Sequence, residues 1–263
     1  MTILDQLADH ARKRVIADME ENSLDVMRDL AMLKSSATGV PFAFEQALRK
    51  KGINFICECK KASPSKGLIA PNFPYLEIAK EYEAAGADCI SVLTEPKWFL
   101  GKDEYLKEIA ETVSVPCLRK DFTVDEYQIY QAKVFGASAV LLICSILTEQ
   151  QMTEYIGICD NFGLSALVEA HDKQEVQMAL NAGARIIGVN NRNLKDFSVD
   201  TDNSRRLREL IPSNVLFVSE SGVRTAEDVA ALRKIGADAV LIGETLMRAP
   251  DKKAKLTELR GAV

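Results

Sequence analysis

The sequence predicts an α/β protein of the (β/α)8 TIM-barrel class. Two observations carry this prediction. A short motif, Gly-Ala followed closely by an apolar run and called here the recurring phrase, occurs four times along the chain at nearly even intervals, and eight short apolar segments alternate with segments of helical pattern. The length of 263 residues agrees with it, because α/β barrels commonly use about 250 residues for one domain.

The first 50 residues precede the first predicted strand. They are rich in charge, show helical patterns at 3–19 and 24–33, and end in the segment VPFAFEQALRK. Such a short segment provides little material for an independent core. We therefore expect residues 1–50 to be a helical extension that lies on the barrel, and residues 1–263 to form a single barrel domain.

The recurring phrase marks helix ends and strand starts. Gly86, Gly136, Gly183 and Gly236 are each followed by alanine and soon by an apolar run such as CISVL or AVLLI. Glycine commonly ends a helix because it adopts the left-handed conformation without penalty. These glycines lie about 50 residues apart, roughly twice the length of one βα unit, so another strand should lie between each pair.

Eight apolar segments are the predicted strands. Nearly continuous apolar runs are typical of a parallel sheet whose faces are covered by helices. The alternative is an open doubly wound sheet, which usually has fewer strands and a phosphate loop after its first strand; the sequence contains no G-x-G-x-x-G or Walker segment. The predicted strands are 55–60, 89–93, 117–121, 139–143, 165–170, 186–190, 216–221 and 239–243.

The helices between these strands begin with recognisable signals. Four segments show a capping box or a close variant, in which a side chain and a backbone N–H exchange hydrogen bonds across the first turn. The four signals are Thr123-x-x-Glu126, Thr148-x-x-Gln151, Asp172-x-x-Glu175 and Thr225-x-x-Asp228.

Composition excludes several classes of function. The net charge of −5 gives no general affinity for nucleic acid. The six cysteines lie mostly in apolar runs without a C-x-x-C pair, and the only histidines are His10 and His171, so we expect reduced thiols and no metal site. We find no signal peptide and no apolar stretch of membrane-spanning length. A cytoplasmic location is therefore expected.

Charged residues are concentrated at the carboxyl ends of the predicted strands, where barrel enzymes carry their active sites. Glu58, Lys60, Lys120, Glu169 and Glu220 all follow hydrophobic strand residues and should converge on one mouth. Structural salt bridges or solvated strand ends could explain any one of them. Burying all five is costly unless they pair or serve a function, so the set favours acid–base chemistry by side chains.

Small residues after the last two strands predict a phosphate site. Ser221 and Gly222 follow the seventh strand, and Gly243 and Glu244 follow the eighth. Barrels frequently bind phosphate there through backbone N–H groups and a helix N-terminus, and Ser63 in the first loop could add a hydroxyl. Ordinary tight turns are the alternative. A carboxylate beside phosphate is unfavourable, so the Glu244 side chain should turn away.

In combination and in order, these residues resemble the indole-3-glycerol-phosphate synthase family. The run ECKKASPSKG at 58–67 is similar to that family's E-x-K-x-x-S-P-S segment, and the resemblance covers the whole chain, including the N-terminal extension. Further similar segments lie at 93–95, 98–101, 119–122, 167–169, 188–194, 219–223 and 241–247.

The resemblance implies a reaction and roles. The family converts 1-(2-carboxyphenylamino)-1-deoxyribulose 5-phosphate into indole-3-glycerol phosphate with loss of CO2 and water, and needs no cofactor. By position, Lys120 resembles the general acid at the substrate carbonyl. Glu169 and Lys60 resemble the other acid–base partners, and Glu58 resembles a proton relay. The division of roles among Lys60, Lys120 and Glu169 stays open.

The resemblance also implies how the substrate is held. Asn190 and Glu220 should orient the reacting groups and sugar hydroxyls, and Arg192 should pair with the substrate carboxylate. Phe99 and Phe122 should form apolar walls for the aromatic ring, although a simple barrel-mouth core would explain them too. The positions similar to the phosphate site are Ser63, Gly222, Gly243 and Glu244; some family members carry serine where Glu244 stands.

Three other functions remain as alternatives. A phosphosugar isomerase barrel would share the phosphate site but usually works with a cysteine–aspartate pair. A Schiff-base aldolase would use Lys60 or Lys120 as its nucleophile, and a phosphate-binding barrel without catalysis would leave the mouth charges unexplained. For the leading interpretation we expect a small anionic substrate, a monomer or weak oligomer, and no nucleic-acid or membrane partner. His171 is expected to be a loop residue.

Overall fold

The computed structural model describes residues 2–37, 40–193 and 197–261. Leu194, at the end of the 188–194 segment, lies outside the described residues. Eight parallel strands form a closed barrel, confirming the predicted fold class. Around the barrel their order is β1, β10, β9, β8, β7, β6, β5 and β4. Each predicted strand is present to within one residue at either end.

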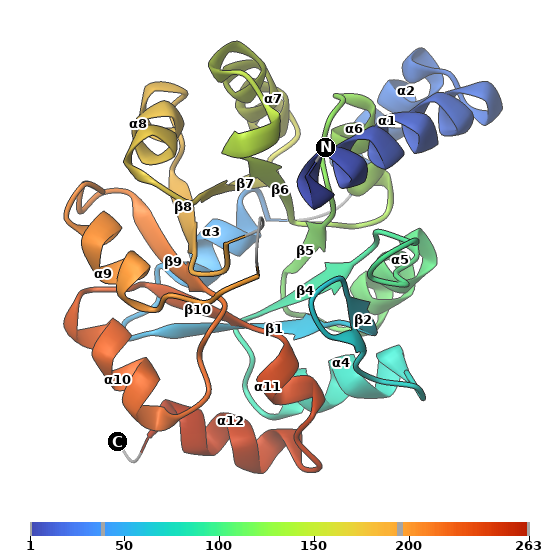
Figure 1. The fold of residues 1–263 in the computed structure, drawn as a ribbon. Coiled ribbons are helices and arrows are strands. Elements are labelled where there is room, and N and C mark those ends of the chain that lie inside the picture. Colours follow the sequence, from blue (N-terminus) through green and yellow to red (C-terminus); the bar gives the residue numbers. More distant parts are fainter. Residues whose placement is uncertain (1, 38–39, 194–196, 262–263) are drawn as a thin grey trace.

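Figure 1 looks along the barrel and shows the helices as an outer ring. A short antiparallel pair, β2 with β3, extends from the loop after β1. The strands are β1 Asn54–Cys59, β2 Ala62–Ser63, β3 Gly67–Leu68, β4 Cys89–Leu93, β5 Cys117–Lys120, β6 Ala139–Ile143, β7 Ser165–Ala170, β8 Ile186–Asn190, β9 Leu216–Glu220 and β10 Ala239–Ile242.

The helices alternate with the strands after a three-helix N-terminal segment. They are α1 Ile3–Glu21, α2 Leu24–Ala37, α3 Ala43–Leu48, α4 Tyr75–Ala84, α5 Asp103–Thr112, α6 Tyr127–Val134, α7 Glu149–Asn161, α8 Lys173–Asn181, α9 Asp202–Arg208, α10 Ala226–Lys234, α11 Glu244–Met247 and α12 Lys252–Arg260, with a 3-10 turn η1 at Cys144–Ile146.

Glycines end the helices that precede β4, β6, β8 and β10, as the recurring phrase predicts. All four have φ between 77° and 89°, a region that glycine enters without the strain other residues would suffer. This sharp ending lets the chain reverse directly into the next strand. The phrase therefore sets the spacing of four of the eight βα units.

Two of the four helix-start signals are capping boxes in the structure and one is wrong. Thr148 and Thr225 make complete boxes, while the Asp172 side chain caps the backbone N–H groups of Gln174 and Glu175. Thr123 caps nothing, because α6 begins only at Tyr127. The Gln128 side chain instead holds the preceding segment, accepting from Val124 N and donating to Phe122 O.

The core has an inner and an outer layer. Inside the barrel, residues such as Ile56, Leu118, Leu167 and Val218 pack with one another, and Leu7 of α1 belongs to the same cluster. The outer layer fills the space between strands and helices. All six cysteines are free and buried in these layers, and burial raises the pKa of each thiol.

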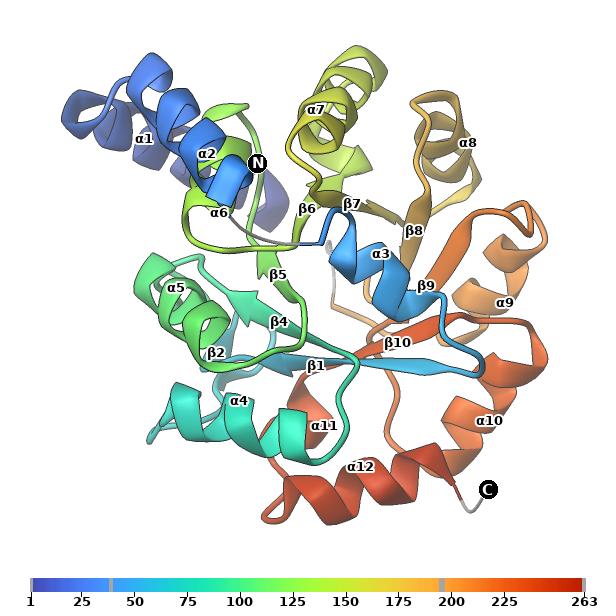
Figure 2. The same cartoon turned by 180° about the vertical axis from the view of Figure 1, so that it is seen from behind.

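The N-terminal segment contacts both ends of the barrel. Figure 2 shows α3 across the end opposite the catalytic face expected for barrels, where Glu45 N donates to Ser165 Oγ at the start of β7. At the other end α1 passes beside the mouth, and Arg14 makes a bidentate pair with Asp121, at 2.6 and 3.1 Å. The expectation that residues 1–50 lie on the barrel is consistent with these contacts.

Candidate active site

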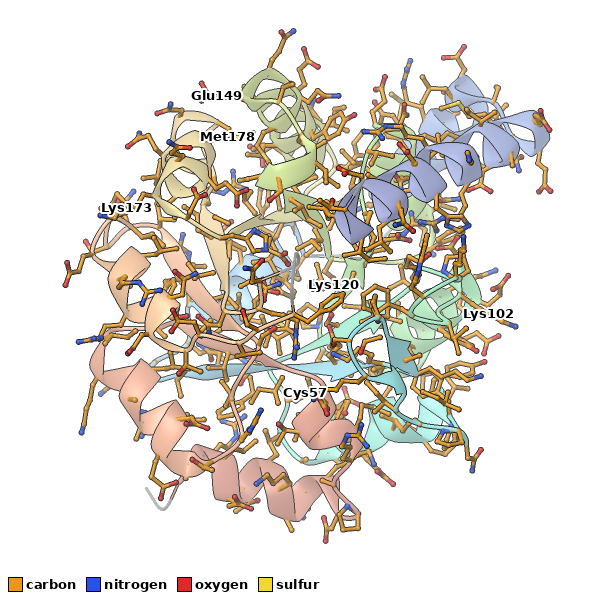
Figure 3. The ribbon with its side chains drawn as sticks, viewed as in Figure 1. Cys57, Lys102, Lys120, Glu149, Lys173 and Met178 are labelled. Carbon is orange, nitrogen blue, oxygen red and sulfur yellow. The ribbon has the colours of Figure 1, made fainter. Side chains whose placement is uncertain are left out.

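The carboxyl ends of the strands surround a cavity of about 560 Å³. Glu58, Lys60, Lys120, Glu169 and Glu220 all line it, so the structure brings the five predicted charges together. Figure 3 labels Lys120 near the centre of the ring of strands. Asn190, Arg192, Phe99, Phe122, Ser63, Ser221, Gly222, Gly243 and Glu244 line the same cavity.

Lys120 lies between two buried carboxylates. Its Nζ is 3.1 Å from Glu169 Oε2 and 3.5 Å from Glu220 Oε2. Asn190 donates its amide to Glu169 Oε1 at 3.2 Å, so both oxygens of Glu169 are engaged. Glu220 Oε1 is buried and has no hydrogen-bond partner among the described residues. This oxygen lies against Gly188, where a Cβ would overlap it.

Lys60 and Glu58 form a second pair on the same wall. They are two residues apart on an extended segment, so both side chains point into the mouth. Lys60 Nζ lies 2.6 Å from Glu58 Oε1. Lys60 follows the last residue of β1 and is partly exposed, whereas Glu58 is buried. The pair thus places a partly exposed ammonium group beside a buried carboxylate.

Gly188 of β8 and Gly243, which follows β10, make room for the carboxylates of Glu220 and Glu58. A Cβ at Gly188 would overlap Glu220 Oε1, and a Cβ at Gly243 would overlap Glu58 Oε1 and crowd Lys60 Nζ. One oxygen of each carboxylate consequently lies close against the glycine backbone. Glycine at 188 and 243 is required by this close approach.

The surroundings of Glu169 and Glu220 shift the pKa values of these two carboxyl groups in opposite directions. Burial works against ionisation of Glu169, but Lys120, His171 and Asn190 outweigh it and hold its pKa well below the usual range. Burial, together with the charges of Glu169 and Glu58, raises the pKa of Glu220 to about 8 despite Lys120. One carboxyl is therefore ionised while the other holds a proton at neutral pH.

Lys120 remains an ammonium group in this setting. Burial favours its neutral form, but the charges of Glu169, Glu220 and Glu58 outweigh burial and raise its pKa above the ordinary value for lysine. A lysine in this state is a proton donor and an electrostatic partner rather than a nucleophile.

The residues after β9 and β10 that were predicted to bind phosphate line the cavity. Ser221 and Gly222 have φ of 66° and 91°, so the chain turns sharply after β9. Thr245 Oγ1 donates to Val223 O at 2.7 Å and ties this turn to the start of α11. Glu244 pairs with Arg248 at 3.1 Å. Its carboxylate is thus engaged with a cation, and both residues line the cavity.

The other end of the cavity is apolar. The Phe99 and Phe122 rings lie 6.2 Å apart, and Ile3 and Leu7 of α1 also line the cavity. Glu95, fully buried, accepts the backbone N–H groups of residues 97–99 and so fixes the loop that carries Phe99. Arg192 lines the cavity while its Nη1 donates to Phe197 O at 3.1 Å.

The neighbours of Lys120 face the other way, because strand residues alternate sides. Arg119 is buried against the outer layer, where it donates to Asp103 and to the carbonyl oxygen of Gln128. Asp121 accepts from Arg14 and Thr94. Charges at a strand end therefore divide into those of the cavity and those that hold α1 and α5 in place.

Sequence reasoning missed His171 and the residues of α1. His171 lies in the loop after β7, as expected, but its Nε2 is 3.3 Å from Glu169 Oε1, a contact that was not predicted. The spacing of two residues from Glu169 was a usable signal, since such residues project to the same side. The contribution of Ile3 and Leu7 had no local signal.

No group of three or more metal-binding side chains occurs within residues 2–37, 40–193 and 197–261. In the same part of the chain, no helix is long and apolar enough to span a membrane.

Comparison with known proteins gives a family model and relatives that carry the same description and match nearly the whole chain. The model of the family described as "Indole-3-glycerol phosphate synthase" matches residues 4–259. A protein of that name from Ruminiclostridium cellulolyticum is 59% identical over 260 residues, covering 99% of each chain. Another from Leuconostoc mesenteroides is 48% identical, covering 98% of this chain and 99% of its own.

Solved structures of lower identity share the fold. The 3-hexulose-6-phosphate synthase of Salmonella typhimurium superposes with a TM-score of 0.65 at 15% identity, over 79% of this chain and 96% of its own. The thiamine phosphate pyrophosphorylase of Pyrococcus furiosus gives a TM-score of 0.60 at 19% identity, over 81% and 96%.

Proposed function

Because the chain belongs to the indole-3-glycerol phosphate synthase family, we propose that Lys120, Glu169 and the charges around them close the indole ring of its product. The enzyme is a carboxy-lyase of tryptophan biosynthesis. It converts 1-(2-carboxyphenylamino)-1-deoxyribulose 5-phosphate into indole-3-glycerol phosphate, CO2 and water. The placement of Lys120 between Glu169 and Glu220 is the observation that carries the proposed roles.

Lys120 is the general acid at the substrate carbonyl. The aromatic carbon that bears the carboxylate attacks the ketone carbon, and negative charge develops on the ketone oxygen. An ammonium group at this point stabilises the charge and supplies the proton. The raised pKa of Lys120 supports this role and disfavours a Schiff base.

Glu169 is the ionised partner that removes a proton as the ring becomes aromatic. Its lowered pKa supports a carboxylate at neutral pH. Lys60 protonates the departing hydroxyl, and Glu58, 2.6 Å from it, relays the proton. CO2 leaves from the ring carbon that made the attack, and the electron pair of the broken carbon–carboxylate bond returns to the ring.

Binding at both ends folds the flexible substrate. The phosphate lies against the backbone of Ser221, Gly222, Gly243 and Glu244 with the Ser63 hydroxyl nearby. Arg192 pairs with the substrate carboxylate, and Phe99 and Phe122 enclose the aromatic ring. Clamping both ends brings the two reacting carbons together. Asn190 and Glu220 hold the catalytic groups and the sugar hydroxyls.

The test is direct. The purified chain is incubated with the carboxyphenylamino deoxyribulose phosphate while indole absorbance and fluorescence are followed. We expect turnover without added metal or nucleotide, with no covalent adduct after borohydride treatment. Trapping of substrate on Lys60 or Lys120 would instead support Schiff-base chemistry, and binding without turnover would support a non-catalytic barrel.

We also propose that residues 1–263 form one catalytic domain, with residues 1–50 as its helical extension. Contacts of α1 and α3 with both ends of the barrel support this. Six free, buried cysteines favour a reducing compartment, and we propose a cytoplasmic location. A monomer or weak oligomer is expected, and sedimentation of the purified chain measures this.

A further inference from the structure

His171 stands directly behind the proposed base. It follows Ala170, the last residue of β7, and is two residues beyond Glu169, so both side chains project to the same side. Its Nε2 lies 3.3 Å from Glu169 Oε1, and its Nδ1 lies 2.9 Å from Glu175 Oε2. The imidazole therefore lies between two carboxylates: Nδ1 is hydrogen-bonded to Glu175, whereas Nε2 is at ion-pair distance from Glu169 without hydrogen-bond geometry.

Glu175 fixes the imidazole from the outer side. It lies in the first turn of α8, where its Oε2 also accepts the backbone N–H of His171 at 2.7 Å. Its Oε1 accepts from Ser145 Oγ at 2.5 Å. Asn203 of α9 donates to His171 O at 3.0 Å. Backbone and ring of His171 are thus held from η1, α8 and α9 at once.

We propose that His171 is a positioning residue for ring closure: as an imidazolium clamped by Glu175, it keeps Glu169 ionised and turned toward Lys120. This inference rests on the proposed role of Glu169. His171 does not line the cavity, so it acts through Glu169 rather than on the substrate.

The two oxygens of Glu169 have different partners. Oε2 faces Lys120, whereas Oε1 faces His171 and Asn190. A cation on the Oε1 side stabilises the charge on the carboxylate and resists its rotation. Loss of that cation leaves Oε1 with the neutral amide of Asn190, so protonation of Glu169 should become easier.

The charges around His171 agree with an imidazolium. Burial favours the neutral ring, but Glu169 and Glu175 outweigh burial and raise the pKa of His171 to about 10. Glu220 of β9 and Lys120 of β5 face it from beyond Glu169, and Asp172 is its chain neighbour. The contacts from η1 and α9, Ser145 and Asn203, are neutral.

Imidazole NMR provides a test that does not depend on turnover. The chain has two histidines, so a His10→Asn variant identifies the signals of His171 in protein labelled with 15N-histidine. We expect both ring nitrogens of His171 to stay protonated through pH 8. In Glu169→Gln the titration midpoint should fall by about one pH unit or more. Titration near pH 6.5 in the unaltered protein would overturn the proposal.

The pH profile of kcat tests the effect on Glu169. In His171→Ala the acid limb should move upward by about one to two pH units, and kcat at pH 7 should fall roughly tenfold, with KM changed less than threefold. His171→Gln keeps a neutral donor and should shift the limb as far as alanine does. Glu175→Gln should cause a smaller shift in the same direction, and added imidazole should restore part of the activity of His171→Ala.

The outcomes separate this proposal from the one on which it rests. An unchanged acid limb in a folded His171→Gln variant would overturn the positioning role alone. Full activity of Glu169→Gln would show that Glu169 is not the base. The positioning role of His171 would then fail as well, whatever the NMR titration shows. If His171→Ala does not fold, the pH profile of His171→Gln and the NMR titration still decide whether His171 has the positioning role.

Discussion

The carboxylate of Glu58 occupies the space in which a Cβ at Gly243 would stand. Glu58 lies on β1, and Gly243 directly follows the neighbouring strand β10, in which Ile242 pairs with Cys57. The last strand thus shapes the wall formed by the first. A methyl group at this point should disturb chemistry without disturbing the fold.

We expect Gly243→Ala to lower kcat about 100-fold, since a displacement near 1 Å can cost that much in a positioned site. The methyl group would push Glu58 and Lys60 away from their present positions. Gly243 has φ of −112°, so alanine adds no backbone strain. Steady-state kinetics and a urea unfolding curve measure both effects.

Gly157 provides the matched control. It lies inside α7, and a Cβ there meets nothing within 4 Å. Gly157→Ala should leave kcat unchanged and raise the free energy of unfolding by up to about 1 kcal/mol. Equal activity of the two variants would contradict the steric explanation.

Lys120→Ala should lose about 10²- to 10³-fold or more in kcat, the loss typical of removing a group that stabilises transition-state charge. The circular dichroism spectrum should stay unchanged. Indole fluorescence measures the rate. Lys102→Ala is the control, because Lys102 is exposed at the outer rim in Figure 3 and does not line the cavity; a similar loss there would point to a non-specific effect.

The stability of the protein should fall with rising pH on account of Glu220. Its pKa is raised to about 8 in the folded state, against about 4.3 in an unfolded chain. Between these values the folded state binds more protons than the unfolded state, so the free energy of unfolding decreases as pH rises. Glu220→Gln removes this dependence because it cannot ionise.

Urea unfolding of Glu220→Gln and of the unaltered chain at pH 5 and pH 8 measures the effect. We expect the variant to be more stable by more than about 1 kcal/mol at pH 8, with a smaller difference at pH 5. A difference that is larger at pH 5 would show that Glu220 is ionised in the folded protein.

Arg14→Met should lower the free energy of unfolding by about 3 kcal/mol, because it leaves the buried Asp121 without its principal partner. The ion pair attaches α1 to the residue after Lys120, and α1 supplies Ile3 and Leu7 to the cavity. KM should therefore rise more than kcat falls. Arg12→Met is the control, because Arg12 makes only an exposed pair with Asp9.

Leu100→Asn should stabilise the protein by about 1 kcal/mol, since asparagine tolerates left-handed backbone better than leucine does. Leu100 has φ of 53° and is 39% exposed, so little packing is lost. Thermal unfolding measures the change. Leu210→Asn, at 41% exposure and without positive φ, should give no gain.

The barrel could be predicted from the sequence because its signals are local. Glycine after the helices that precede β4, β6, β8 and β10, and apolar runs of strand length, depend on neighbouring residues alone. The Thr123 signal failed because the side chain of Gln128, the second residue of α6, satisfies the backbone of Phe122 and Val124, so the helix starts later.

The charges of the site could be predicted because parallel strands of a barrel end on one rim. The pairing among them could not. Whether Lys120 meets Glu169 or Glu58 depends on strand register, and the contact of His171 with Glu175 depends on where α8 packs. The wall supplied by α1 comes from the remote end of the sequence, where nothing local marks it.

Because all six cysteines are buried, thiol reagents should not modify them in the folded protein. A single cysteine introduced at an exposed position would then be the one site that a fluorophore or spin label modifies. Pairs of such labels on α1 and on the loop after β1 could report distances across the mouth during turnover, with the six natural thiols left in place.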